Sequence, residues 1–387
     1  MLKAIRAEKL FDGLSDHPQL GRTVVIEDGL IVDVVADDPA LPAESEQFDT
    51  PLLAPGFIDM QINGAMDVLF NDQPTVETIS RIAQGARRGG CAYLLPTFIT
   101  AGGQAYRQAM CAARDALDQG VPGVLGAHLE GPFLCKARPG IHDAAAIRMI
   151  EPADIDHLLD HRSGVRLITL APEEQPPGTI QKLADAGWIV FAGHSDAGFD
   201  QMAFAMGEGL RGVTHVFNAM SQVTPREPGV VGSALADRGL FAGIIADGHH
   251  VHPANLRLAA DRLGADRLCL VTDAMPTLFG TRTSFSLTGK DIHLSDGRLI
   301  EVDAGENLVD GRLAGAHLSM IDAVRNMIRL TGVSTGEAIR MASATPAHAL
   351  GLVGELGRIA PGYRAGLTLL DEGLGLLGVI VDGCRLD

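Results

Sequence analysis

The chain has few aromatic residues, few cations relative to acids, and no long hydrophobic run. Aromatic residues make up 4% of its 387 residues, and 31 Lys and Arg face 48 Asp and Glu, a net charge of −17. Nucleic-acid binding needs a basic footprint, so no nucleic-acid partner is expected. No segment approaches the ~20 apolar residues of a membrane span, and residues 1–8 lack the apolar core of an export signal. We therefore expect no membrane association.

Cysteine is also scarce, and its spacing excludes two common uses. The five cysteines are odd in number, scattered, and contain no CxxC pair (Cys91, Cys111, Cys135, Cys269 and Cys384). A disulfide framework or a cysteine-based zinc site would need paired spacings. Reduced thiols in a cytoplasmic protein are the expected state.

Apolar runs of strand length alternate with helical patterns through most of the chain. The runs lie near 52–60, 91–97, 123–129, 165–171, 188–193, 212–216, 241–246 and 268–272. Between them, helical patterns occur at 75–88, 104–118, 152–160, 178–186, 199–209 and 254–263. Continuous apolar strands separated by helices are typical of a parallel sheet covered on both faces. Eight of them predict an α/β fold, a closed TIM-like (β/α)8 barrel.

The two ends of the chain have a different pattern, with short strands and Asp-Gly turns. The strands expected there are Lys3–Phe11, Thr23–Ile26, Leu30–Val35, Gly357–Ile359, Leu367–Leu370 and Val379–Val381. The simplest arrangement is a small β-sandwich built from both termini, which divides the chain into 1–53, 54–354 and 355–387. A hairpin with Asp296-Gly297 at its tip is expected within 282–303, followed by helices at 319–331 and 334–343.

Polar residues able to bind a metal follow the ends of the predicted strands. They are Gln61 and Asn63 after the first strand, then Glu130, His194, His215, Asp247 and Asp273 after later ones. In a (β/α)8 barrel the carboxyl ends of all strands meet at one face, where the chemistry takes place. These residues, distant in sequence, are therefore expected to be neighbours in space.

Glu130, His194 and His215 form a ligand set suited to one divalent ion. A single histidine at a strand end is more commonly a hydrogen-bonded structural residue, but two with a carboxylate at one face favour a metal site. Water on such an ion loses several pKa units and becomes a nucleophile near neutral pH. Asp273 could take and return a proton, although helix capping is the alternative, since Ala274-Met275-Pro276 follows.

Several motifs resemble those of N-acetylglucosamine-6-phosphate deacetylases of the amidohydrolase superfamily. They occur in order from about residue 54 to Pro361-Gly362, at 54–64, 128–133, 192–197, 214–220, 226–229, 245–251 and 270–274. The resemblance implies the same barrel and small β-sandwich. It also implies metal-dependent hydrolysis of N-acetyl-D-glucosamine 6-phosphate to D-glucosamine 6-phosphate and acetate, in amino-sugar catabolism.

The same resemblance implies roles for individual residues. Glu130, His194 and His215 match the metal ligands, Asp273 the proton-transferring aspartate, and His142 a histidine that contacts the sugar and polarises the acetyl carbonyl. Substrate contacts are implied for Ile141, His142, Asn218, Ala219, Arg226, Asp247, His250, Leu313 and Gly315. A neighbouring subunit lends some of these contacts in the family, which implies a homodimer.

The sequence departs from many amidohydrolases at the end of the first strand. Where relatives carry His-x-His, this chain has Gln61 and Asn63, and amides are poor ligands compared with imidazole. The fourth strand, 167–173, offers no lysine for a bridging carbamate. One ion per subunit is therefore expected, with Gln61 and Asn63 left either to a weak second site or to orienting water. Zinc is the first expectation, and iron, cobalt and manganese fit the same ligands.

An anionic substrate must bind within a strongly acidic chain. Arg226 and His250 are expected to supply the local positive charge, since guanidinium grips phosphate in a bidentate fork. The alternative for Arg226 is an ion pair with Glu227 or another neighbour. Three alternative functions remain open: deacetylation of an epimeric N-acetylhexosamine phosphate, another amidohydrolase reaction such as cyclic amide hydrolysis, and non-catalytic sugar-phosphate binding.

Overall fold

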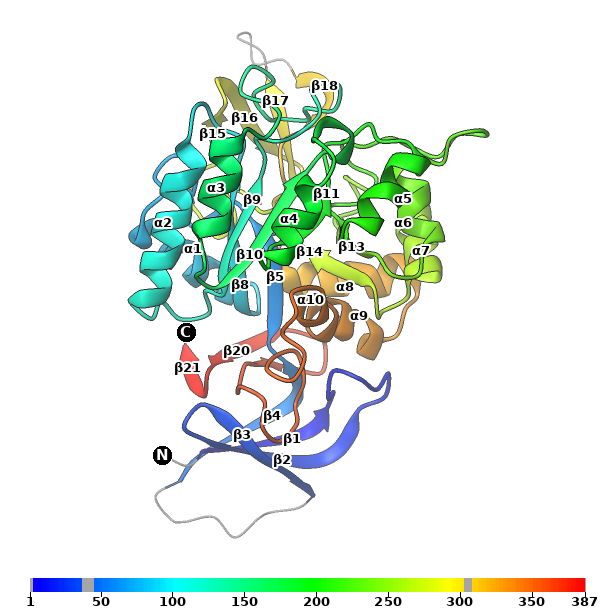
Figure 1. Cartoon of the computed structure of the whole chain (residues 1–387). Helices are drawn as coiled ribbons and strands as arrows, with labels where there is room; N and C mark the ends of the chain where they lie inside the picture. Colours follow the sequence, from blue (N-terminus) through cyan, green and yellow to red (C-terminus); the bar gives the residue numbers. More distant parts are fainter. Residues whose placement is uncertain (1–2, 37–44, 303–307, 387) are drawn as a thin grey trace.

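A computed structural model describes residues 3–36, 45–302 and 308–386, and its centre is a barrel of eight parallel strands (Figure 1). The strands are β5 (Phe57–Ile62), β8 (Cys91–Ile99), β9 (Gly126–Glu130), β10 (Val165–Leu170), β11 (Ile189–Ala192), β12 (Gly212–Val213), β13 (Phe241–Ile245) and β14 (Leu268–Val271). They neighbour one another in chain order. The predicted (β/α)8 barrel is confirmed.

Backbone hydrogen bonds close the barrel between its first and last strands, just beyond the end of β14. The N–H of Asp273 donates to the carbonyl of Gln61 at 2.8 Å, and the N–H of Asn63 donates to the carbonyl of Ala274 at 2.9 Å. The closure therefore lies at the carboxyl ends of β5 and β14. It brings Gln61 and Asn63 beside Asp273.

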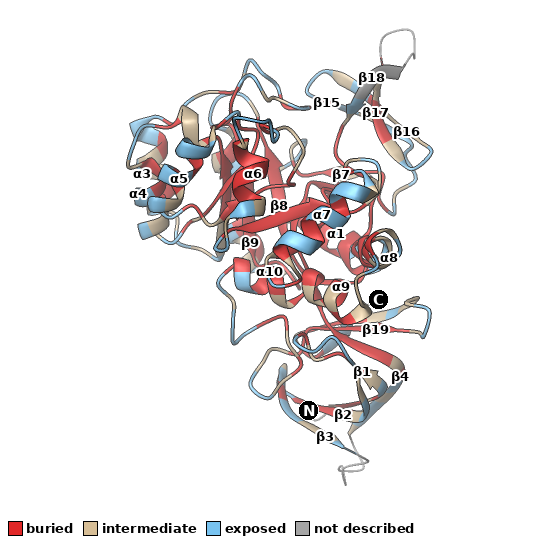
Figure 2. Ribbon diagram, turned by 90° about the vertical axis from the view of Figure 1, so that its right-hand side faces the viewer, coloured by how far each residue is buried: buried red, intermediate tan, exposed pale blue. Residues whose placement is uncertain are grey.

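Helices cover the outer face of the barrel and expose only one side to solvent (Figure 2). They are α1 (Val76–Arg88), α2 (Ala105–Asp118), α3 (Pro152–Asp160), α4 (Thr179–Asp185), α5 (Phe199–Gly207), α6 (Gly229–Ala236), α7 (Pro253–Leu263) and α8 (Met320–Thr331). In α1 the buried residues Ile79, Ile82, Ala83 and Ala86 recur at the spacing of one helix face. The side chain of Thr75 caps its first turn by accepting from the N–H of Thr78.

Two further helices, α9 (Thr335–Ala342) and α10 (Ala344–Ala349), and a 3-10 turn (Pro172–Glu174) complete the helical elements of the described residues. The helices expected at 319–331 and 334–343 are confirmed as α8 and α9. Helix α6 was not predicted. Its sequence, GVVGSALA, is nearly uniformly apolar and buried, so it lacks the polar face that identifies a surface helix.

The two termini meet in one seven-stranded sheet below the barrel in Figure 1. Its order is β21-β20-β19-β4-β1-β2-β3, with β1 (Lys3–Leu10), β2 (Gln19–Glu27), β3 (Leu30–Ala36), β4 (Glu46–Pro55), β19 (Leu367–Leu370), β20 (Leu376–Val381) and β21 (Cys384–Leu386). Pairing of β19 with β4 joins the end of the chain to its beginning. The sheet encloses a core of its own, which includes Ile5, Val24, Leu53 and Ile380. The predicted union of both termini in one small β-domain is thus confirmed, and the described strands of the expected β-sandwich form a single continuous sheet.

Two details of the predicted strands differ. The apolar run 52–60 is split at Gly56 into β4 of the terminal sheet and β5 of the barrel, and β4 crosses residue 53. A Cβ on Gly56 would lie 2.5 Å from that of Ala92, so glycine is required where the chain passes between the two sheets. The strand expected at Gly357–Ile359 is wrong. Gly357 has φ +84 and packs against α10, which turns the chain. The division into 1–53, 54–354 and 355–387 stays a prediction.

A four-stranded antiparallel sheet lies above the carboxyl ends of the barrel strands (Figure 1). It consists of β15 (Ser284–Leu287), β16 (Lys290–Ser295), β17 (Arg298–Val302) and β18 (Leu308–Leu313). The predicted hairpin is confirmed, because Ser295 pairs with Arg298 and both Asp296 and Gly297 have positive φ. Two short paired strands, β6 (Gly64–Ala65) and β7 (Val68–Leu69), follow β5 in the sequence. Within the described part of the chain, we find no helix with the length and apolarity to cross a bilayer.

Candidate metal centre and active site

Three strands of the barrel deliver the predicted ligands to one point. Glu130 is the last residue of β9, while His194 and His215 each stand two residues beyond the ends of β11 and β12. The Nε2 atom of His215 lies 2.9 Å from Oε1 of Glu130, and that of His194 lies 3.3 Å from the same oxygen. The two Nε2 atoms are 3.2 Å apart.

These separations fit ligands of a single ion. Donor atoms ~2.0–2.1 Å from a tetrahedral cation lie roughly 3.3 Å from one another. The Nδ1 atom of His194 is 3.0 Å from the carbonyl oxygen of Arg138, to which it can only donate. In the neutral ring this leaves the lone pair of Nε2 facing the centre, as metal ligation requires. All three side chains are buried. The donor set therefore fits a divalent metal.

Protonation of the three ligands is coupled. Burial favours a neutral Glu130, but hydrogen bonds with His194 and His215 hold the pKa of its carboxyl well below the usual value. Burial likewise opposes charge on His215, yet its hydrogen bond with Glu130 raises the pKa of the imidazole. Because a proton on His215 competes with an ion for Nε2, metal affinity should fall as the pH decreases.

The backbone is strained where the chemistry-bearing side chains leave their strands. His194, His215 and Asp273 have φ values of +47, +28 and +49, in the left-handed region that non-glycine residues rarely adopt. Each such residue costs of order 1–3 kcal/mol unless its surroundings impose the conformation, and such residues cluster at functional sites. The shared conformation follows three different strands, which points to function rather than to a local turn preference.

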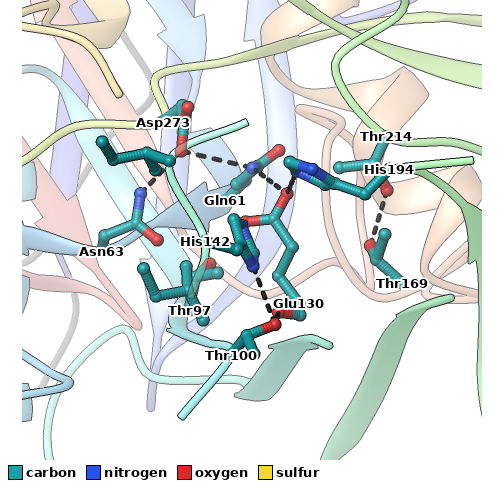
Figure 3. A network of polar contacts seen from close by, with 12 residues as sticks. Gln61, Asn63, Thr97, Thr100, Glu130, His142, Thr169, His194, Thr214 and Asp273 are labelled. Atoms are coloured by element: carbon teal, nitrogen blue, oxygen red, sulfur yellow. Dashed lines mark hydrogen bonds and ion pairs between the residues drawn. The ribbon is translucent and has the colours of Figure 1, made fainter. Parts of the chain in front are cut away.

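Two amide side chains connect Asp273 to the ligand cluster (Figure 3). The Nδ2 atom of Asn63 donates to Oδ1 of Asp273 at 2.6 Å, and Nε2 of Gln61 donates both to that oxygen at 3.3 Å and to Oε1 of Glu130 at 3.1 Å. The Oδ1 atom of Asn63 is buried without a hydrogen-bond partner among the described residues. Gln61 and Asn63 thus hydrogen-bond the carboxylate of Asp273, and their role at a weak second metal site or in orienting water stays a prediction.

Asp273 is a buried carboxyl group close to a second one. Burial, strengthened by the negative charge of Glu130, raises the pKa of Asp273 to about 6. A group with this pKa can both accept and release a proton near neutral pH. The structure therefore places a suitable proton carrier beside the ligand cluster.

His142 reaches the same centre from the segment that follows β9. Its Nδ1 atom is 2.8 Å from the hydroxyl of Thr100, and its Nε2 atom is 3.9 Å from Oε2 of Glu130 (Figure 3). Its ring centroid lies 4.2 Å from that of His194. Burial, reinforced by the neighbouring His194, lowers the pKa of His142 well below the usual value, so the imidazole is neutral.

Polar side chains inside the barrel support the ligands from below. Hydrogen bonds link Thr97 to His128 at 3.1 Å, His128 to Thr169 at 2.8 Å and Thr169 to Thr214 at 2.6 Å. Burial lowers the pKa of His128 to about 4, so this ring stays neutral. The chain of hydrogen bonds joins β8, β9 and β10 to the residue after β12 and satisfies polar groups that would otherwise be costly to bury.

A second group able to bind metal, Cys135, Glu173 and Glu174, lies beside the ligand cluster. Glu173 accepts hydrogen bonds from the hydroxyl of Ser195 at 2.7 Å and the N–H of Asp196 at 2.5 Å. These contacts hold the turn that carries His194. We assign this group a supporting role.

A cavity of about 310 Å³ opens over the candidate metal centre. The predicted site residues that line it are Glu130, Ile141, His142, His194, His215, Asn218, Ala219, His250, Asp273, Leu313 and Gly315. Asp247 does not line the cavity but holds His250 in place. Its carboxylate lies 2.6 Å from Nδ1 of His250 and accepts the backbone N–H of His250 at 2.8 Å. The structure thus gathers most of the predicted residues around one cavity.

Arg226 does not line this cavity within a single chain. It is exposed in the segment between β12 and α6, which projects from the body of the molecule (Figure 1). No ion pair with Glu227 forms, since the carboxylate of Glu227 accepts the N–H groups of Phe199 and Gly229 instead. The role of Arg226 in substrate binding stays a prediction.

Sequence reasoning missed two polar residues that line the cavity, His249 and Arg312. His249 follows β13 beside His250, so the position at a strand end could have identified it. Arg312 lies on β18, far from any barrel strand in sequence, and reaches the cavity only because the upper sheet lies over the barrel. It also lies 3.4 Å from Glu301.

Comparison with known proteins agrees with this geometry. The amidohydrolase family matches residues 52–385. The chain belongs to this family. It is 39% identical over 333 residues to an N-acetylgalactosamine-6-phosphate deacetylase of Shewanella sp. (strain ANA-3), covering 86% of this chain and 82% of the relative.

The resemblance stated from the motifs is confirmed. An N-acetylglucosamine-6-phosphate deacetylase of Haemophilus influenzae is 34% identical over 364 residues, 93% of each chain. The crystal structure of N-acetylglucosamine-6-phosphate deacetylase from Pasteurella multocida superposes with a TM-score of 0.92 at 32% identity and covers 100% of both chains. Barrel and terminal sheet therefore both occur in a solved deacetylase.

The ligand set predicts how metal content responds to substitution. We expect one ion per chain, and we expect His215→Ala to weaken metal affinity by at least about 100-fold, since it removes a direct ligand. The measurement is elemental analysis and metal titration of the purified variants. His249→Ala is the matched control, because it removes an imidazole from the same cavity but outside the ligand set. Equal metal loss in both variants would contradict the assignment.

Proposed function

We propose that this protein hydrolyses the acetamide of N-acetyl-D-glucosamine 6-phosphate to D-glucosamine 6-phosphate and acetate. The observation that carries the proposal is the convergence of Glu130, His194 and His215 on one point, with Asp273 beside them at the same cavity. In the reaction the oxygen of water bonds to the acetyl carbon and the C–N bond breaks. The nitrogen leaves with a proton from water.

Glu130, His194 and His215 would hold a divalent ion, and the chemistry it would supply is a lowered pKa of the attacking water and polarisation of the acetyl carbonyl. Asp273 accepts a proton from the attacking water and later gives it to the departing nitrogen. Its amide partners orient it, since Asn63 and Gln61 both donate to Oδ1. The second carboxylate oxygen stays free to receive the proton.

His142 stabilises the negative charge that develops on the acetyl oxygen. The single proton of the Thr100 hydroxyl can go to Nδ1 of His142, at 2.8 Å, or to the carbonyl oxygen of Glu130, at 3.4 Å. When it goes to the nearer Nδ1, the proton of the neutral ring resides on Nε2, which lies on the side of Glu130. A donor fixed in a buried site stabilises a developing oxyanion more strongly than water does. The neutral state of His142 therefore suits this role.

The phosphate end of the substrate binds at His250 and the segment Asn218–Ala219. Asp247 fixes His250 through Nδ1 and leaves Nε2 for the ligand. Ala219 has φ +49, in the left-handed region. Hydrogen-bond donors close to the phosphate are needed because the chain as a whole carries a charge of −17 and repels anions.

We propose zinc as the ion, because two imidazoles and one carboxylate with an open position are a common catalytic zinc set. Iron, cobalt and manganese fit the same donors, and availability decides among them. We also propose a cytoplasmic location, supported by five cysteines that all remain free of disulfides. Elemental analysis of the protein from its native source identifies the metal.

Replacing Asp273 tests the proton transfer. We expect Asp273→Asn to fold and retain metal while kcat for acetate release falls by at least about 100-fold, since general acid–base catalysis contributes that much. Wild-type kcat/KM should fall as the pH drops through the pKa of Asp273, at or below about 6, because a bound cation favours the carboxylate. The exposed Asp261→Asn is the control. Undiminished turnover in Asp273→Asn would refute the role.

A second substrate is favoured by a specific finding. The Shewanella relative named for N-acetylgalactosamine 6-phosphate has 39% identity, above the 34% of the H. influenzae relative named for the glucosamine epimer. The two sugars differ only in the configuration at C4. N-acetylgalactosamine 6-phosphate is therefore the alternative substrate.

A comparison of the two epimers decides between them. For a glucosamine enzyme, kcat/KM should be higher for N-acetylglucosamine 6-phosphate by about tenfold or more, the effect of one hydrogen bond of about 1.4 kcal/mol. The reverse order assigns the galactosamine substrate. Release of no acetate from either sugar by the metal-loaded protein would favour a binding protein or another amidohydrolase.

We further propose a homodimer in which each chain lends Arg226 to its partner's cavity. The support is that Arg226 is exposed in a projecting segment and does not line its own cavity, while the phosphate end needs positive charge. Guanidinium binds phosphate oxygens in a bidentate fork. A closed two-fold dimer would complete both sites at once.

Complementation tests this sharing. Arg226→Ala should raise KM by about 10–100-fold, the value of a charged hydrogen bond, and Asp273→Asn should be inactive. A heterodimer of the two variants contains one site with both residues intact. Co-expression should therefore restore about a quarter of the wild-type sites by random pairing. No restoration, or a monomer by light scattering, would exclude a shared site.

A further inference from the structure

A second cavity, of about 750 Å³, lies at the opposite end of the barrel from the candidate metal centre. Helices α9 and α10 and the terminal sheet lie below the barrel in Figure 1, whereas the sheet β15–β18 lies above it. Arg211, Arg238 and Arg267 line the cavity just before β12, β13 and β14, at the amino ends of the strands. Arg340 and Arg358 line it from α9 and from the segment after α10.

Few carboxylates balance these five guanidinium groups. Asp266 is the only acid among the described lining residues, and it lies 3.6 Å from Arg340. Arg340 also pairs with Asp16 at 2.6 Å, so its charge is compensated. Arg238 and Arg358 form no ion pair with the described residues, and Nε of Arg358 is buried without a hydrogen-bond partner.

Two of the arginines donate to backbone carbonyls and form no ion pair with the described residues. Arg211 donates to the backbone carbonyls of His348 and Ala349 at 2.6 and 2.7 Å. Arg267 donates to the carbonyls of Asp237 and Arg262. A carbonyl satisfies a donor but carries no full charge, and burial lowers the pKa of both guanidinium groups. The carboxylate of Asp237 accepts the N–H groups of Gly239 and Leu240, and its negative charge also acts on Arg267.

Structural bracing explains part of this cluster. Arg211 ties α10 to the barrel, and Arg340 ties α9 to the segment at Leu14. Bracing does not explain Arg238, which makes no such bond, or Arg358, whose guanidinium stacks 5.5 Å from the ring centroid of Tyr363. Such stacking restricts a guanidinium and leaves its in-plane donors available. Uncompensated cations around a cavity, in a chain of charge −17, concentrate positive potential locally.

We propose that this cavity binds a small phosphorylated anion with two or more negative charges. Arg238 and Arg358 would contact its phosphate oxygens. Arg211 and Arg267 would add positive charge without contacting the anion. Guanidinium groups suit this chemistry because their planar forks match phosphate oxygens. Since Arg358 and Tyr363 lie on the segment that leads to β19, a bound anion also ties this segment to the barrel and stabilises the folded chain.

The test is calorimetric titration of the metal-loaded protein with three probes: inorganic pyrophosphate, glucose 6-phosphate and adenosine triphosphate. The variant R238Q/R358Q removes two guanidinium groups from the cavity. We expect its affinity for the best probe to be about 100-fold weaker, about tenfold for each charged hydrogen-bonding group. R88Q/R257Q is the matched control, with the same change of charge at two exposed positions outside this cavity.

A probe that binds at the metal centre instead of this cavity is recognised because it still binds to R238Q/R358Q. The wild-type and control proteins should show a rise in unfolding temperature with the probe that R238Q/R358Q lacks. The probe that binds most tightly shows whether the anion is an inorganic phosphate, a sugar phosphate or a nucleotide. If the double variant does not fold, Arg238→Gln alone changes an exposed side chain and should weaken binding about tenfold. Equal affinity in all proteins, or no binding to wild type beyond the metal-centre site, overturns the proposal.

Discussion

The structure depends on the cost of burying ionised groups at the carboxyl face of the barrel. Glu130 and Asp273 are both buried, and the charge of the first raises the pKa of the second. Two carboxylates cannot both stay ionised cheaply in such a place unless positive charge joins them. A divalent ion at the candidate site of Glu130, His194 and His215 would supply that charge, so the proposed metal and the proposed ionised base have one physical origin.

The surrounding fold holds these groups in position. Left-handed backbone at His194, His215 and Asp273 is unfavourable alone, so packing and hydrogen bonds must impose it. Contacts from Glu173 brace one of these turns, and the closure of β5 against β14 fixes Asp273. The stability of the barrel and the geometry of the site therefore depend on the same contacts.

The two ends of the barrel differ in charge and in construction. The carboxyl end gathers acids and imidazoles around a cavity of about 310 Å³, which favours a cation. The amino end gathers guanidinium groups around a cavity of about 750 Å³, which favours an anion. Both arise from residues placed just outside strand ends, where a parallel barrel collects side chains from distant parts of the chain.

Sequence alone determined the barrel and brought the candidate site residues to one end of it, because both follow local rules. Apolar runs buried on both faces identified the strands, and polar residues at their ends identified Glu130, His194, His215 and Asp273. Strand Gly357–Ile359 was mistaken, since its backbone is set by packing of Gly357 on α10 rather than by propensity. Helix α6 was missed because complete burial removes the amphipathic pattern. Only the tertiary structure decided the place of Arg312, the exposure of Arg226 and the arginine-lined cavity, because these depend on contacts between segments far apart in the chain, which no local pattern encodes.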